Sequence, residues 1–107
     1  GLGYRRTIVA FQPHTYTRTI KLFDRFVEEL KRPDIAILAE IYAARETNTL
    51  GISSNDLALE IPGSIYCPTL ADVTRQLRRL AQPGDLILTV GAGDIYLAGE
   101  ALLRGEG

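Results

Sequence analysis

Apolar residues in this chain alternate between short continuous runs and longer stretches with a helical spacing. The continuous runs predict four buried strands, at 6–11, 34–41, 64–67 and 85–90. Stretches with apolar residues three or four positions apart predict helices from Thr17 or Thr19 to about Lys31, at about 55–60, at 70–81 and at 95–103. Strands that alternate with helices in this way predict an α/β fold, a Rossmann-like three-layer domain with a mainly parallel sheet flanked by helices.

Residues at the expected element boundaries support this pattern. Pro33 ends the first helix, because proline cannot continue the hydrogen bonding of a helix. Ser53 or Ser54 can cap the second helix and Thr69 the third, each through a side-chain oxygen that accepts a backbone N–H. The run at 34–41 is nearly all apolar, which is typical of a parallel strand covered on both faces.

Composition narrows the class of protein and its partners. A length of 107 residues fits one domain, and 46% hydrophobic with 23% charged residues is ordinary for a globular protein. The formal net charge of −1 gives no electrostatic reason to bind nucleic acid, and no apolar run approaches a membrane span. The single cysteine, Cys67, rules out an intramolecular disulfide and suits a reducing compartment. We therefore expect a cytoplasmic protein without nucleic-acid or membrane partners.

Parallel α/β sheets bind ligands beyond the carboxyl ends of their strands, which selects the connections at 12–18, 42–52, 68–69 and 91–94. The first contains His14, the only histidine, and Arg18 lies near a helix N-terminus whose free N–H groups favour anions. With Thr15 and Tyr16 beside them, these side chains predict a site for a carboxylate or a phosphate. A structural histidine and a solvated arginine are an alternative of about equal weight.

The last candidate connection is glycine-rich and consists of Gly91, Ala92, Gly93 and Asp94. It resembles the opening of a dinucleotide-binding fingerprint, in which glycines let the backbone approach a ligand closely. Tyr96 stands where the third glycine of that fingerprint belongs, so a nicotinamide cofactor is only weakly indicated. A tight turn with Asp94 as a helix cap is the alternative.

Arg45 and Glu46, in the second connection, also have two interpretations. They either pair with each other in solvent, where an ion pair contributes little to stability, or place one side chain in the cleft. The sequence lacks a G-x-x-x-x-G-K-[ST] phosphate loop, a G-x-S-x-G serine elbow and a metal-ligand pattern. We therefore expect no metal site and no complete set of catalytic residues in this chain by itself.

Several segments together resemble the C-terminal domain of the Mur ligase family, and within it the members that join L-alanine to UDP-N-acetylmuramate. The segments are FQPHTYTRT at 11–19, LFDRF at 22–26, IYAARE at 41–46, GISSNDLA at 51–58 and VGAGDIY at 90–96. The string at 11–19 is specific, whereas GAGD is less so. Many members have arginine where Thr15 stands and glycine where Arg45 stands, which weakens any role assigned to those two side chains.

This resemblance implies one domain of a three-domain ATP-dependent ligase of peptidoglycan biosynthesis. In that family an N-terminal domain holds the UDP-sugar and a central domain holds ATP and Mg²⁺. The muramoyl carboxylate is activated as an acyl phosphate, which the amino group of L-alanine attacks. The resemblance implies that His14 and Arg18 line the amino-acid and phosphate side of the cleft. The chain's partners would be the other domains and these substrates, and by itself it is expected to be inactive and to bind no ATP or Mg²⁺ tightly.

The resemblance also implies an acidic, histidine-containing loop and a helix ahead of the first strand, and we expect the 107 residues to lack both. We therefore expect part of the nucleotide contact surface to be missing and an apolar patch to be exposed on the sheet. Three alternatives stay open. The first is a related ligase that attaches a preformed murein tripeptide, the second is a free-standing nucleotide- or anion-binding module, and the third is a structural domain without a ligand.

Overall fold

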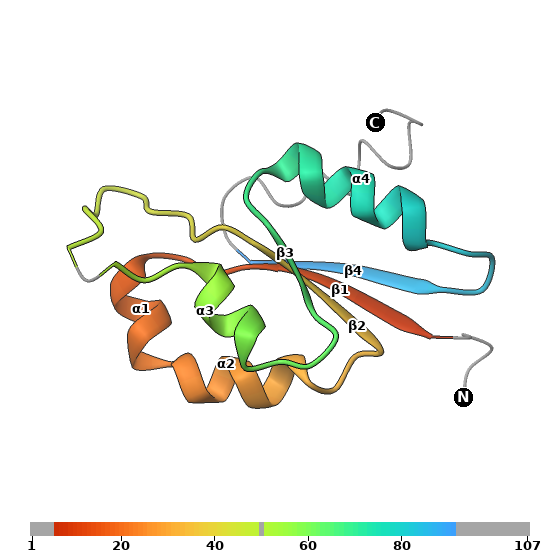
Figure 1. Cartoon of the computed structure of the whole chain (residues 1–107), viewed down its shortest axis with the longest axis horizontal. Helices are drawn as coiled ribbons and strands as arrows, with labels where there is room; N and C mark the ends of the chain where they lie inside the picture. Colours follow the sequence, from red (N-terminus) through yellow and green to blue (C-terminus); the bar gives the residue numbers. More distant parts are fainter. Residues whose placement is uncertain (1–5, 50, 92–107) are drawn as a thin grey trace.

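Four parallel strands form one sheet in the computed structural model, which describes residues 6–49 and 51–91. The strands are β1 (Thr7–Gln12), β2 (Ile35–Ala39), β3 (Ile65–Cys67) and β4 (Leu86–Gly91), in the spatial order β3-β2-β1-β4 (Figure 1). Each neighbouring pair is parallel. The predicted α/β architecture with a parallel sheet is therefore confirmed.

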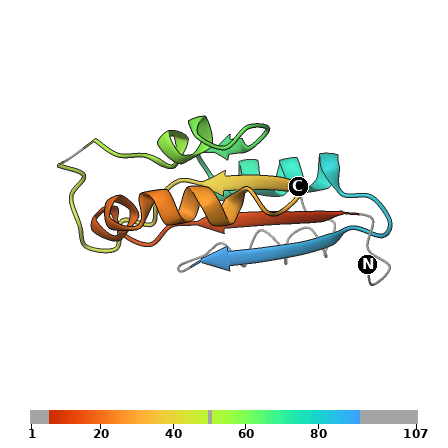
Figure 2. The ribbon, with the colours of Figure 1, turned by 90° about the horizontal axis from the view of Figure 1, so that it is seen from below.

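Helices cover both faces of this sheet. On one face lie α1 (Tyr16–Lys21), α2 (Phe23–Leu30) and α3 (Ser54–Leu59), and on the other lies α4 (Leu70–Leu80), as Figures 1 and 2 show. In a right-handed crossover, the direction in which the chain moves across the sheet decides the face on which the connecting helix lies. The chain moves from β1 to β3 in one direction and crosses back to β4 in the other, so α4 lies on the opposite face from α1, α2 and α3. The helix predicted at 95–103 lies outside the described residues.

Alternate residues of the strands point into two hydrophobic cores. The core on the α4 side contains Ile8, Ala10, Ile37, Ala39, Cys67, Val73 and Leu77. The core on the opposite side contains Val27, Leu30, Ala36, Leu38, Leu57 and Ile61. Each fully buried large aliphatic side chain contributes roughly 1.5–3 kcal/mol, so the central strands hold the domain together.

The caps predicted for α3 and α4 are present. Ser53, rather than Ser54, caps α3 in a capping box, in which the carboxylate of Asp56 accepts a hydrogen bond from Ser53 N at 2.9 Å. Thr69 caps α4, and its Oγ1 accepts a hydrogen bond from Asp72 N at 3.1 Å. These helices therefore begin where their side-chain chemistry dictates.

The single helix predicted to begin at Thr17 or Thr19 is divided at Leu22 into α1 and α2, and its N-cap is Thr15. The apolar spacing was misleading because it continues through Ile20, whose side chain is 40% exposed in α1. Packing against the sheet sets the direction of α2, which carries a core residue at each turn. Hydrogen bonds to the loops at the end of the sheet set the direction of α1, as described below.

The sheet face on the side of α2 is uncovered over β4. Leu88 and Val90 are 42% and 46% exposed, and they lie beside Val9 and Phe11 of β1 in the strand register. In Figure 2, which looks onto this face, β4 lies clear of α1 and α2. These four side chains form an apolar patch of the kind expected from the sequence, here at the edge of the described sheet.

Candidate functional site

The connections after β1 and β2 are hydrogen-bonded to each other at the carboxyl end of the sheet. Thr15 N donates to Tyr42 O at 2.8 Å, and Tyr42 N donates to Pro13 O at 2.8 Å. The bonds extend the parallel pairing beyond the strands, as a bridge between His14 and Tyr42. Two of the loops selected from the sequence therefore lie side by side.

Thr15 has an unusual backbone conformation at this junction. Its φ of 66° and ψ of 149° fall in a region that residues other than glycine rarely adopt. Its N–H is bound to Tyr42, and its carbonyl oxygen accepts from Thr19 N at 3.2 Å and Thr19 Oγ1 at 2.7 Å. Its Oγ1 accepts from Arg18 N at 3.3 Å. These contacts hold a strained turn between His14 and α1, as is common at functional sites.

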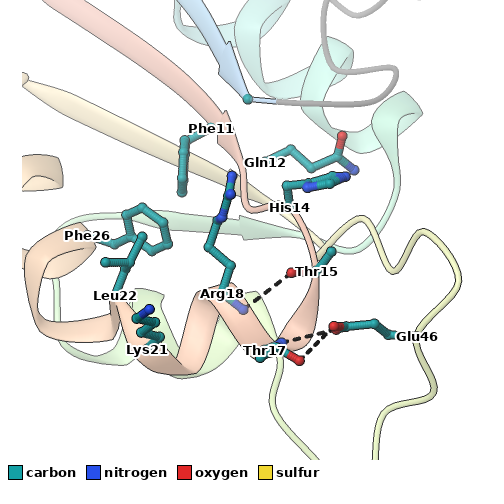
Figure 3. Close-up of a pocket in the computed structure, with 11 residues that line it drawn as sticks. Phe11, Gln12, His14, Thr15, Thr17, Arg18, Lys21, Leu22, Phe26 and Glu46 are labelled. Atoms are coloured by element: carbon teal, nitrogen blue, oxygen red, sulfur yellow. Dashed lines mark hydrogen bonds between the residues drawn. The ribbon is translucent and has the colours of Figure 1, made fainter.

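A cleft of about 840 Å³ opens beside the carboxyl end of β1 and the start of α1 (Figure 3). Its apolar wall consists of Phe11, Leu22 and Phe26. Gly91 and a set of polar residues complete the lining: Gln12, His14, Thr15, Thr17, Arg18, Lys21 and Glu46. In Figure 3 the side chain of Arg18 extends from α1 toward Phe11, between the apolar wall and His14. The cleft thus combines an apolar surface with basic side chains.

His14 and Arg18, the two residues predicted to form an anion site, both line this cleft, and Thr15 lines it with them. The imidazole of His14 is stacked on the ring of Tyr42, with centroids 5.6 Å apart and an interplanar angle of 16°. The side chain of Tyr16 lies elsewhere, beside a neighbouring cavity of about 260 Å³. The geometry therefore brings together three of the four residues grouped from the first loop.

Glu46 occupies the N-terminus of α1, which the sequence suggested was available to a ligand. Its Oε1 accepts hydrogen bonds from Tyr16 N at 2.7 Å and Thr17 N at 3.0 Å, and its Oε2 accepts one from Thr17 Oγ1 at 2.6 Å. The bonds from Thr17 and Tyr16 hold the pKa of Glu46 below its usual value, and the nearby His14 lowers it further. The expectation of free N–H groups at this helix start was therefore wrong.

The remaining predicted residues divide into three groups: an exposed arginine, a glycine in the cleft lining, and residues that the structure does not describe. Arg45 is exposed and forms no ion pair with Glu46, whose carboxylate is turned to α1 instead. Gly91 ends β4 and lines the cleft, with a φ of 135°. A Cβ atom at this position would lie 2.3 Å from Gln12 O, so the close approach of the two strands requires glycine. Ala92, Gly93 and Asp94 lie outside the described residues.

Glu40, at the carboxyl end of β2, is a structural carboxylate that the sequence analysis did not single out. It accepts hydrogen bonds from Ile41 N at 2.9 Å, Ser54 N at 2.8 Å and Tyr66 Oη at 2.8 Å. Burial opposes the charged form, but these donors outweigh it and hold the pKa of Glu40 below its usual value. Its backbone oxygen accepts from Gln12 Nε2 at 3.0 Å. The sequence offered one signal for Glu40, because it is a charged residue near the end of the nearly apolar run at 34–41.

The amino-acid sequence is similar to several curated ligases. The chain is 48% identical to UDP-N-acetylmuramate–L-alanine ligase of Lachnospira eligens, over 94% of the chain and 23% of the relative. The identity is 45% to the ligase of the same name from Acetivibrio thermocellus and 45% to that from Clostridium tetani, over 95% and 92% of the chain. Over the length that it spans, the chain is a relative of UDP-N-acetylmuramate–L-alanine ligases. No protein-family model matches it.

The chain spans about 23% of the length of these UDP-N-acetylmuramate–L-alanine ligases. The match covers nearly the whole of this chain, so the resemblance noted in the sequence is confirmed along its length. In the part of the chain that the structure describes, no group of three or more His, Cys, Asp or Glu side chains is placed to hold a metal ion. Among residues 6–49 and 51–91 no helix has the length and apolar character to cross a membrane.

Proposed function

We propose that this chain is the C-terminal domain of a cytoplasmic ligase that joins L-alanine to UDP-N-acetylmuramate in peptidoglycan biosynthesis. The observation that carries the proposal is the identity of 41–48% with ligases of that name, over 92–96% of the chain. The position of the cleft at the carboxyl end of a parallel sheet is in keeping with a ligand site. The domain would work with the other domains of such a ligase.

The cleft chemistry fits one part of this reaction. The amino acid carries a carboxylate, which the planar guanidinium of Arg18 can bind through two parallel hydrogen bonds. Phe11 and Leu22 offer an apolar surface that suits a methyl side chain. Lys21 adds positive charge at the rim, and His14 adds an imidazole held by Tyr42. We infer that these groups orient the amine for attack on the acyl phosphate and offset negative charge there.

ATP and Mg²⁺ do not fit the described residues alone. ATP supplies the phosphoryl group that activates the muramoyl carboxylate, and Mg²⁺ prefers carboxylate oxygens and phosphates. The described residues contain no acidic cluster, and the sequence contains no phosphate loop. We propose that other domains hold both. Calorimetric titration of the 107-residue chain with ATP and Mg²⁺ should give no binding in the micromolar range, whereas micromolar affinity would favour a free-standing nucleotide-binding module.

The decisive experiment assays the complete gene product for phosphate release from ATP with UDP-N-acetylmuramate and either L-alanine or murein tripeptide. We expect release that depends on L-alanine. Turnover with the tripeptide and refusal of L-alanine would favour the related recycling ligase instead.

The residue-level test is Arg18→Ala in the same protein. Loss of a charged hydrogen-bonding partner for the amino acid should lower kcat/KM for L-alanine about 10- to 100-fold. The melting temperature should change little, because Arg18 is exposed. Arg25→Ala, which removes an exposed guanidinium outside the cleft lining, is the matched control. Normal kinetics with a large drop in melting temperature would instead assign Arg18 a structural role.

A further inference from the structure

The helix that carries Arg18 has little packing to hold it in place. α1 has six residues, and Thr19 is its one buried side chain. A helix of about one and a half turns has marginal stability without external contacts, because nucleation is unfavourable and so short a helix has few backbone hydrogen bonds to offset it. The direction in which α1 presents Arg18 must therefore be set largely by hydrogen bonds at its N-terminus.

Those bonds come from two sources. Thr15 Oγ1 binds Arg18 N, whereas the carboxylate of Glu46 binds the two preceding amides, Tyr16 N and Thr17 N, and the hydroxyl of Thr17. Glu46 is 30 residues from Tyr16 in sequence, so its contact joins α1 to the connection after β2. Bonds of this kind to an ionised acceptor are about twice as strong as neutral ones.

The local structure presents the Glu46 carboxylate to α1. Glu46 N donates to Ala43 O at 3.0 Å, which closes a tight turn in which Ala44 has a φ of 56°. This turn follows directly after Tyr42, whose backbone is paired with the loop before α1. In Figure 3 Glu46 approaches Thr17 from the side of this connection, while Arg18 extends toward the cleft.

We propose that Glu46 is a positioning residue that holds α1 in the orientation in which the Arg18 guanidinium faces the substrate carboxylate. The inference rests on the proposed function and extends it, since it assigns Glu46 a role exerted through Arg18 rather than on substrate. It also explains why a carboxylate lies within an otherwise basic cleft, since Glu46 accepts hydrogen bonds from the backbone amides at the start of α1.

The test is a kinetic double-mutant cycle in the complete gene product, with initial rates measured against L-alanine. Glu46→Ala should raise KM for L-alanine about tenfold, with kcat less affected, because the Arg18 side chain loses its alignment. If Glu46 acts through Arg18, the same substitution in the Arg18→Ala background should change KM less than twofold. Glu46→Gln keeps one carbonyl oxygen for the amides of Tyr16 and Thr17, so its KM should lie close to that of the unsubstituted protein.

Two further variants keep the proposal testable if Glu46→Ala folds poorly. Thr17→Val removes one of the three bonds to Glu46 and should raise KM in the same direction by a smaller factor. Glu28→Ala removes an exposed carboxylate on α2, away from the cleft, and should leave KM unchanged. Hydrogen–deuterium exchange should report faster exchange at the N-terminus of α1 in Glu46→Ala and not in Glu28→Ala.

The outcomes separate this inference from the function on which it rests. Absence of L-alanine-dependent activity in the unsubstituted gene product would overturn the proposed function. Normal activity there with an unchanged KM in both Glu46→Ala and Thr17→Val would overturn the positioning role. Additive effects of Glu46→Ala and Arg18→Ala would do so as well, since they would mean that Glu46 acts independently of Arg18.

Discussion

Glu40 offers a test of how the carboxyl end of the sheet is held together. Glu40→Ala removes the acceptor for Ile41 N, Ser54 N and the hydroxyl of Tyr66, at 2.8–2.9 Å. Hydrogen bonds to a charged group contribute about 1.5–3 kcal/mol each, and water can partly replace this half-buried carboxylate. We therefore expect the three bonds together to contribute about 3 kcal/mol. In a domain of this size that corresponds to a fall in Tm of about 10–20 °C.

The assay is thermal unfolding of the chain followed by far-ultraviolet circular dichroism at pH 7 and at pH 3. Because the pKa of Glu40 in the folded state lies below its usual value of 4.5, its stabilisation is complete above that value and is lost as pH falls through the folded pKa. The difference in Tm between Glu40→Ala and the unsubstituted chain should therefore shrink at pH 3. Glu40→Gln, which keeps one acceptor oxygen, should show a smaller loss at pH 7.

The matched control is Glu60→Ala, which removes an exposed carboxylate just after α3 and should change Tm by no more than a degree or two. A fall of less than about 3 °C for Glu40→Ala at pH 7 would refute the view that Glu40 joins these elements. A difference that stayed the same at pH 3 would refute the assignment of the stabilisation to the ionised carboxylate.

Three further predictions concern the β4 edge and the buried thiol. Gly91→Ala should lower the free energy of unfolding by about 1–3 kcal/mol in a denaturant titration, because its Cβ would meet Gln12 O at 2.3 Å; an unchanged midpoint would contradict this. Val90→Lys should reduce self-association in sedimentation velocity, because Val90 and Leu88 leave an apolar patch exposed, and unchanged sedimentation would count against it. Cys67 is buried and burial raises its pKa to about 11, so Ellman's reagent should modify it at pH 8 only after unfolding.

Local signals in the sequence were sufficient for most of the architecture. The run at 34–41 was apolar enough to indicate a strand covered on both faces, and β2 has one core on each side. Thr69 was recognisable as a cap, and the second cap was narrowed to Ser53 or Ser54, because a capping side chain binds an amide only two or three residues away. The rule that ligands bind beyond the carboxyl ends of parallel strands led to His14 and Arg18, which line one cleft.

The failures have a common physical origin in contacts between residues far apart in sequence. Glu46 does line the cleft, which was one of its two interpretations, but nothing in the sequence indicated that its carboxylate caps a helix 30 residues away. The same contact explains the break at Leu22, since α1 follows its N-terminal hydrogen bonds and α2 follows the sheet. The spacing of apolar residues cannot predict a contact such as that between Glu46 and α1, because it depends on how the loops after β1 and β2 pack together.

Glu46, whose carboxylate caps α1, and Tyr42, whose ring stacks on His14, both belong to the connection after β2, outside the distinctive string at 11–19. A graft of that string alone onto another parallel sheet would transfer His14 without the ring that stacks on it, and Arg18 without the carboxylate that caps its helix. The smallest transplantable unit is therefore the pair of neighbouring βα connections. Loop exchanges between ligases of different amine specificity should accordingly move both connections together.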